Sequence, residues 1–123
     1  MEYKWNPFDA GNSIGTIGSE NGKILKDEEN PFGARITLEE NGSIAPFSIT
    51  VGIYGLMFHT DFYSSLENAE KEFQTFKAKV EKVIEHYSID ENKRDSEWNE
   101  KHNQLMELLT EWKIGIEFFI SGF

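Results

Sequence analysis

The spacing of the apolar residues changes near Ser64, and this change requires two kinds of secondary structure in one chain. Before Ser64, apolar residues alternate with polar ones, which is the period of a half-buried β-strand. After Ser64, they recur at steps of three and four, which is the period of an amphipathic α-helix. The sequence therefore predicts an α+β fold: an antiparallel sheet of about four to five strands, built from hairpins or a meander, followed by two amphipathic helices packed on one sheet face.

The length and the cysteine count set the broad class of the protein. A chain of 123 residues fits one hydrophobic core, so we predict a single domain over residues 1–123, with a β half of about 1–63 and a helical half of about 64–123. The chain has no cysteine, which excludes thiol catalysis, disulfides, cysteine zinc sites and iron–sulfur clusters. Neither glycine-rich stretch has the Lys-Ser/Thr ending of a phosphate-binding loop, and we predict no cofactor.

Two Asn-Gly dipeptides mark predicted hairpin turns, because both residues tolerate the positive φ angles of a two-residue type I′ turn. A turn at residues 41–42 pairs Ile36 with Phe47 and gathers apolar side chains on one face. The turn at residues 21–22 predicts only short or twisted strands, because small residues interrupt the flanking pattern. Residues 27–31, with three carboxylates and a proline, are predicted to form a charged connection.

The stretch ITVGIYGLMFHTDFY reverses its alternation in the middle. Its apolar positions are odd in the first half and even in the second, so one straight strand would carry them from one sheet face to the other. A two-residue turn at residues 54–55 restores a continuous core face by pairing Val51 with Phe58, and a bulge within one long strand is the alternative. Both arrangements place His59 and Asp61 on the face opposite Phe58, away from the core.

Polar side chains gather on the predicted outer face of the sheet. A histidine and an aspartate two residues apart on this face suit a general base or two metal ligands, and an arginine two strands away suits recognition of an anion. The members of this candidate site are Arg35, Ser48, Thr50, His59 and Asp61, with His59 and Asp61 as the candidate catalytic pair. We predict no metal site, because the histidines do not converge by spacing and a catalytic zinc typically takes three protein ligands. The alternative interpretation is the hydrated face of a half-exposed sheet.

The helical half has two predicted segments and an apolar tail. The first is an amphipathic helix of about six turns, with apolar residues from Leu66 to Tyr87 on one face and a start at a capping box of Ser64 and Glu67. The second begins between residues 91 and 97, after a polar run. The tail, residues 114–123, suits either a helix or a strand, and so apolar a segment is expected to dock on the core or on a second copy, which would give a homo-oligomer.

Charge limits the class of partner. The net charge is −10, and it is spread evenly, with four basic and nine acidic groups in residues 1–63 and eight and thirteen in residues 64–123. A field of this sign repels nucleic acid and anionic membranes and attracts a basic protein. The longest apolar run is far shorter than the roughly 20 residues of a membrane helix, and the N-terminus lacks the features of a secretory signal. We therefore predict a soluble cytoplasmic protein.

Two functional hypotheses follow from the sequence. The first is a non-enzymatic acidic protein-binding module, such as an inhibitor or immunity-type protein that caps a basic partner with its aromatic residues and its acidic segments 27–29 and 39–40. The alternative is a small enzyme or ligand-binding domain that uses the polar sheet face around His59 and Asp61. Convergence of these two side chains in a covered pocket favours the alternative, whereas a flat open face disfavours it.

Overall fold

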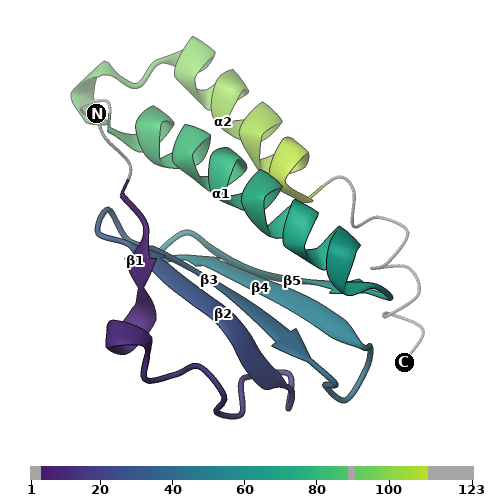
Figure 1. Ribbon diagram of the computed structural model, residues 1–123. Helices are drawn as coiled ribbons and strands as arrows, with labels where there is room; N and C mark the ends of the chain where they lie inside the picture. Colours follow the sequence, from purple (N-terminus) through teal and green to yellow (C-terminus); the bar gives the residue numbers. More distant parts are fainter. Residues whose placement is uncertain (1–3, 89–90, 111–123) are drawn as a thin grey trace. The chain divides into compact units, whose positions relative to one another are not determined.

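The computed structural model describes residues 4–88 and 91–110, with a sheet followed by two helices (Figure 1). The described strands are β1 (Asn6–Pro7), β2 (Lys23–Asn30), β3 (Ala34–Glu40), β4 (Phe47–Ile53) and β5 (Met57–Tyr63), with the 3₁₀ helix η1 (Phe8–Gly11) after β1. The described helices are α1 (Leu66–Tyr87), the 3₁₀ helix η2 (Glu91–Lys93) and α2 (Ser96–Thr110). The predicted α+β class is confirmed.

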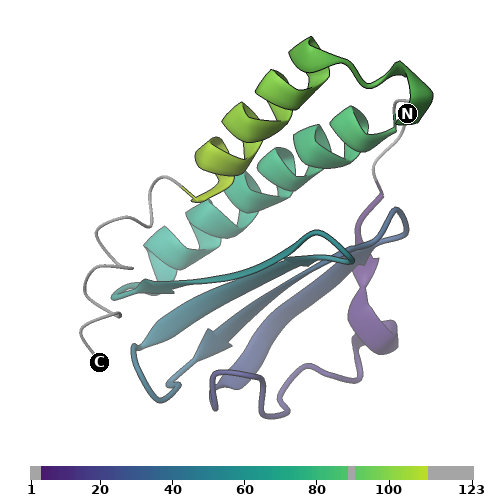
Figure 2. The ribbon, with the colours of Figure 1, turned by 180° about the vertical axis from the view of Figure 1, so that it is seen from behind.

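The strands form one antiparallel sheet in the order β1-β2-β3-β4-β5, so each strand pairs with its neighbour in sequence (Figures 1 and 2). Antiparallel neighbours need only a short turn between them, and short turns connect β2 to β3 and β4 to β5. Because the order is sequential, β5 forms one edge of the five-stranded arrangement.

One face of the sheet, here called the core face, carries the apolar residues of β3 and β4. These residues are Ala34, Ile36, Leu38, Ile49, Val51 and Ile53, all of them buried. The first turns of α1 belong to the same compact unit, and their residues Ala69 and Phe73 are fully buried. The side-chain nitrogen of Lys26, on β2, lies 5.7 Å from the centre of the Phe73 ring. The period-of-two and period-of-3.6 patterns thus both mark residues that are buried.

The chain divides into two compact units, and the boundary falls within α1, between Thr75 and Phe76. The first unit, residues 2–75, contains the sheet. The second contains the rest of α1, in which Val80 and Val83 are buried, and α2, which begins where the sequence predicts and is capped by Asp95 through a 2.9 Å bond from the Trp98 amide. The single-domain organisation stays a prediction, and the tail of residues 114–123 lies outside the described part of the chain.

The start of α1 differs from the prediction by one residue. The side chain that caps the helix is Ser65, whose hydroxyl oxygen accepts a 3.2 Å hydrogen bond from the amide of Asn68, and not Ser64. The predicted helix itself is confirmed, and its apolar positions from Leu66 to Tyr87 all lie within α1.

The register between β3 and β4 differs from the predicted one by four residues. Ile36 pairs with Val51, not with Phe47, because residues 41–46 form a six-residue loop instead of a two-residue turn. Asn41 does adopt a positive φ of 55°, but Gly42 does not, so the dipeptide does not form a type I′ turn. A shift by an even number keeps every side chain on its predicted face. The core residues of β3 and β4 were therefore assigned to the correct face with the wrong partners.

The register between β4 and β5 differs by one residue, which has a larger effect. Val51 pairs with His59 and Gly52 with Phe58, across a three-residue turn at 54–56. Tyr54 does not adopt the positive φ that a type I′ turn requires, whereas Gly55 has a φ of 78°. A shift by one residue exchanges the two faces of a strand, so the predicted pairing of Val51 with Phe58 is wrong and every side chain of β5 lies on the opposite face from the predicted one.

The charged segment 27–31 is also not the predicted connection. Residues 27–30 form the second half of β2, and residues 31–33 make the turn into β3. By contrast, the predicted first hairpin around residues 21–22 contains a single bridge, between Ile17 and Lys23. This acidic segment can form a strand because the Asp27 carboxylate accepts hydrogen bonds from Arg35 and Thr37 on β3.

Candidate functional site

The five residues of the predicted polar cluster do not share one face of the sheet. Arg35, Ser48 and Thr50 lie on the face opposite the core face, here called the outer face. His59 lies across from Val51 and Asp61 across from Ile49, both on the core face, and they are only 4% and 0% exposed. The predicted common face is therefore wrong, because the β4–β5 turn is one residue longer than predicted.

His59 and Asp61 form a buried pair. The Nε2 atom of His59 lies 3.3 Å from Oδ1 of Asp61, which is within ion-pair distance. Among the residues that the structure describes, neither carboxylate oxygen of Asp61 has a hydrogen-bond partner. A buried carboxylate is costly unless it has a polar partner, and His59 is the side chain within ion-pair distance of Asp61. Solvent does not reach either side chain in this arrangement.

The outer face instead contains a network around Arg35. Its guanidinium donates two hydrogen bonds to Asp27, of 2.9 Å and 2.7 Å, and lies 3.5 Å from the centre of the Phe8 ring. Thr37 donates a third bond to the same carboxylate, at 3.0 Å. The hydrogen bond to Asp27 raises the pKa of Arg35 further above its usual value. The charges of Arg35 and Asp27 thus balance each other, and Arg35 is not free to bind an anion as a lone cation.

A second buried carboxylate, Glu39, holds a loop over the outer face. Its oxygens accept hydrogen bonds from the backbone amides of Gly22, at 3.0 Å, and Glu20, at 3.2 Å. Burial raises the pKa of Glu39 above its usual value. Gly18 is required above this carboxylate, since a β-carbon there would lie 2.4 Å from the carboxyl carbon of Glu39. The loop of residues 18–22 is therefore held on the sheet by hydrogen bonds to a buried carboxyl group.

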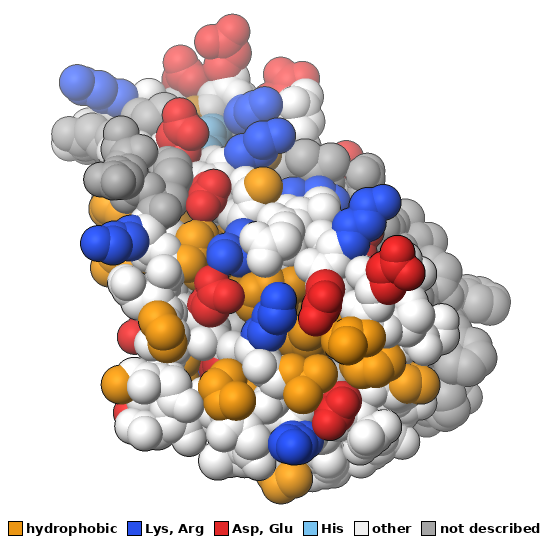
Figure 3. All heavy atoms as spheres, in the orientation of Figure 1, with side chains coloured by type: hydrophobic (Ala, Val, Ile, Leu, Met, Phe, Trp, Pro, Cys, Tyr) orange, Lys and Arg blue, Asp and Glu red, His pale blue; other side chains and the backbone are white. Residues whose placement is uncertain are grey.

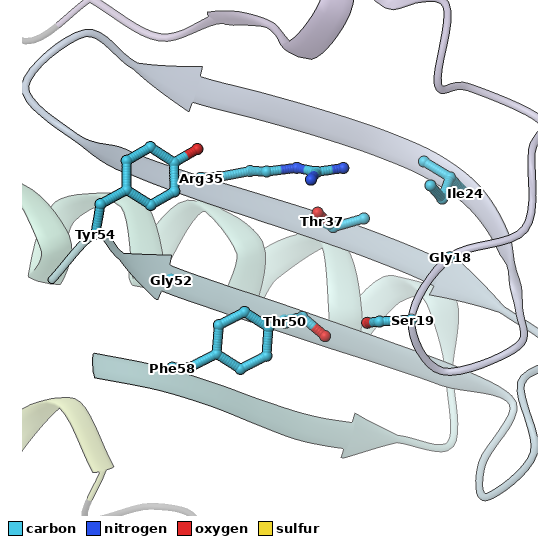
Figure 4. Close-up of a pocket in the computed structure, with 9 residues that line it drawn as sticks. All are labelled: Gly18, Ser19, Ile24, Arg35, Thr37, Thr50, Gly52, Tyr54 and Phe58. Carbon is cyan, nitrogen blue, oxygen red and sulfur yellow. The ribbon is translucent and has the colours of Figure 1, made fainter. Parts of the chain in front are cut away.

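A pocket of about 180 Å³ opens on the outer face between this loop and β5 (Figure 4). Tyr54 and Phe58 stand at one end, Ile24 and the loop at the other, and two threonines lie between them. The lining residues are Gly18, Ser19, Ile24, Arg35, Thr37, Thr50, Gly52, Tyr54 and Phe58. Two members of the predicted set, Arg35 and Thr50, therefore line a pocket, whereas Ser48, His59 and Asp61 do not.

The aromatic end of the pocket is exposed to solvent. Phe58 is 74% exposed and Tyr54 60% exposed. The ring of Phe58 lies over Gly52, where a β-carbon would approach it to 3.2 Å, so the absence of a side chain at Gly52 gives the ring its position. Two large exposed aromatic rings beside a pocket are an arrangement typical of a recognition surface.

The described residues were also searched for a metal site and for a membrane-spanning helix. Within residues 4–88 and 91–110, no group of three or more metal-ligating side chains converges. No helix in this part of the chain is both long and apolar enough to cross a bilayer. Comparison of the chain with protein-family models, curated proteins and solved structures finds no match.

The residues that define this face were missed in the sequence for identifiable reasons. Asp27 stands in a segment that is acidic enough to resemble a loop. The connection itself is residues 31–33, which end in Gly33 and have a normal length for a hairpin turn between β2 and β3. Phe58 was assigned to the core because a two-residue turn at 54–55 pairs it with Val51 and keeps the apolar positions on one face. The signal that was available is Tyr54, whose bulky side chain disfavours the turn that would have buried Phe58.

Proposed function

We propose that this protein is an acidic protein-binding module, of the inhibitor or immunity type, that caps a basic protein partner with the outer face of its sheet. The observation that carries the proposal is the pair of exposed aromatic residues, Tyr54 and Phe58, at the mouth of the pocket. Aromatic residues supply a large share of the binding free energy in protein interfaces, especially where they flank a pocket.

The surface is held rigid before any partner arrives. Phe58 belongs to a strand and lies on Gly52, while the opposite side of the pocket is held by the hydrogen bonds of Glu39. Binding loses less conformational entropy where the contact residues are already held in place, as Phe58 is by its strand and the 18–22 loop by Glu39. This rigidity favours recognition of a folded protein surface.

The charge of the chain supports a basic partner, although by a different route from the one that the sequence suggested. Asp27 and Glu39 are buried, Asp27 bonded to Arg35 on the next strand and Glu39 to the amides of the 18–22 loop, so the acidic segments 27–29 and 39–40 are not simple charged loops. Charges of both signs are interleaved on the surface seen in Figure 3. A net charge of −10 still attracts a basic protein over distances of about 8–10 Å, the screening length at physiological salt.

The alternative, a small enzyme or ligand-binding domain, has one supporting observation. His59 and Asp61 converge to 3.3 Å, as an acid–base pair would. A reaction there requires a substrate to reach the core face, where both side chains are buried. We therefore favour the protein-binding module.

The test is capture of a partner by the full chain and by two variants. Phe58→Ser removes the ring from the outer face, whereas Ile44→Ser removes a side chain of the β3–β4 loop that is 47% exposed and does not line the pocket. We expect the wild type and Ile44→Ser to recover the same basic protein in a one-to-one complex from native cells, and Phe58→Ser to lose it. Calorimetry with the purified partner should give a Kd at least about tenfold weaker for Phe58→Ser only. Equal binding by all three proteins, or recovery of no basic protein, would contradict the proposal.

A further inference from the structure

The size of the outer-face pocket limits what it can hold. Its volume is about 180 Å³, and a cavity of about 150 Å³ in another protein is known to accept one benzene ring. The pocket therefore has room for one ring-sized group and little more. The group must enter from solvent, between the loop at Ser19 and the ring of Phe58 (Figure 4).

The lining of the pocket favours an apolar group. Ile24, Tyr54 and Phe58 supply apolar walls. The two threonines already have hydrogen-bond partners within the sheet, Thr37 with Asp27 at 3.0 Å and Thr50 with Thr60 at 3.1 Å. An apolar group can therefore displace water from the pocket without leaving these hydroxyls unpaired.

The charges around the pocket favour a cation next to that group. Arg35, the cationic residue that lines the pocket, is balanced by Asp27 and so offers little attraction to an anion. The exposed rings of Tyr54 and Phe58 attract cations through their faces, and the chain as a whole carries −10. The size, the lining and the surrounding charge of the pocket therefore all favour one ring-sized apolar group with a cation beside it.

We infer that the pocket formed by Ile24, Tyr54 and Phe58 receives a single aromatic side chain of the basic partner, with a cationic group beside the ring. This inference rests on the proposed function, since it names the contact that the outer face makes. The partner would need an aromatic side chain next to a lysine or arginine on its surface. The partner's ring fills the pocket, and its cation lies over the exposed aromatic end.

Three small molecules of similar shape test this inference without the partner. They are 2-phenylethylammonium, 2-phenylethanol and 3-phenylpropanoate, which are cationic, neutral and anionic. Each is titrated into the full-length, ¹⁵N-labelled protein at low salt while the backbone amide shifts are recorded. We expect saturable shifts at Thr37, Thr50 and Phe58, with Kd values in the millimolar range and an affinity at least about threefold higher for the ammonium than for the carboxylate.

Two variants sharpen the test. Thr50→Ile adds volume inside the pocket and should abolish the saturable shifts, whereas Ile44→Ser should leave them unchanged. Absence of saturable shifts at the pocket in the wild type, or tighter binding of the carboxylate, overturns the inference; this result needs no variant to fold. The outcome is distinct from that of the proposed function: if the partner is captured in a Phe58-dependent manner but the ammonium probe does not bind, the binding face stands and the occupant of its pocket is wrong.

Discussion

The buried carboxylate of Glu39 gives the sharpest prediction for stability. Glu39→Ala removes the acceptor of two backbone amides, Glu20 and Gly22, which hold the 18–22 loop on the sheet. Hydrogen bonds to a charged group contribute about 1.5–3 kcal/mol each. Removal of a carboxylate that burial disfavours, and hydration of the freed amides, offset part of this loss. We expect the free energy of unfolding to fall by about 2–4 kcal/mol.

The assay combines urea unfolding, followed by circular dichroism, with hydrogen exchange at the amide of Gly22. The matched control is Glu40→Ala, since Glu40 is the neighbouring, partly exposed carboxylate, and we expect it to change the free energy of unfolding by less than about 0.5 kcal/mol. In Glu39→Ala the Gly22 amide should exchange faster by an order of magnitude or more. If Glu39→Ala is as stable as Glu40→Ala and the Gly22 amide keeps its protection, the loop is not held by this carboxylate.

Three further predictions follow from particular residues. Gly18→Ala should lower the free energy of unfolding by about 1–3 kcal/mol, because the new β-carbon would displace the Glu39 carboxylate. In the Glu39→Ala background the same change should have little effect, and an additive double-mutant cycle would refute this coupling. Burial lowers the pKa of His86, which stacks on Trp98 at 4.2 Å, so the unfolded chain binds this proton more tightly than the native protein. The contribution of neutral His86 to stability is therefore complete above about pH 6.5 and is lost as the pH falls. In thermal unfolding, His86→Gln should lose less stability than the wild type between pH 7.5 and pH 5. Ala10 has a φ of 53°, so Ala10→Gly should stabilise the protein by about 0.5–1 kcal/mol in urea unfolding, whereas Ala78→Gly, on the exposed face of α1, should destabilise it by about 1 kcal/mol.

The parts of the fold that were predictable are those in which one face of an element carries all the apolar residues. The first helix follows from the steps of three and four that begin at Leu66, and α1 contains all of these positions. The core faces of β3 and β4 follow from the alternation around Ile36 and Val51, even though the loop between these strands is four residues longer than predicted. Burial depends on the period of a pattern, which an even shift in register leaves intact.

The candidate site was not predictable to the same degree, because it depends on the length of one turn. Three residues instead of two in the β4–β5 turn move His59 and Asp61 into the core and Phe58 to the surface. Gly55 suits a turn of either length, and the local signal against the two-residue turn was Tyr54 alone, which does not adopt the positive φ that this turn requires. Asp27 was missed for a related reason: its partners Arg35 and Thr37 lie on the next strand, and only the register brings them within hydrogen-bond distance.

The register of β4 and β5 is the claim on which both proposals rest, and it is directly measurable. Nuclear Overhauser contacts between backbone protons of the two strands report which residues lie opposite each other. We predict contacts of Val51 with His59 and of Gly52 with Phe58. Contacts of Val51 with Phe58 and of Thr50 with His59 would instead bury Phe58 and bring His59 and Asp61 to the outer face, and would contradict the binding surface proposed for this protein.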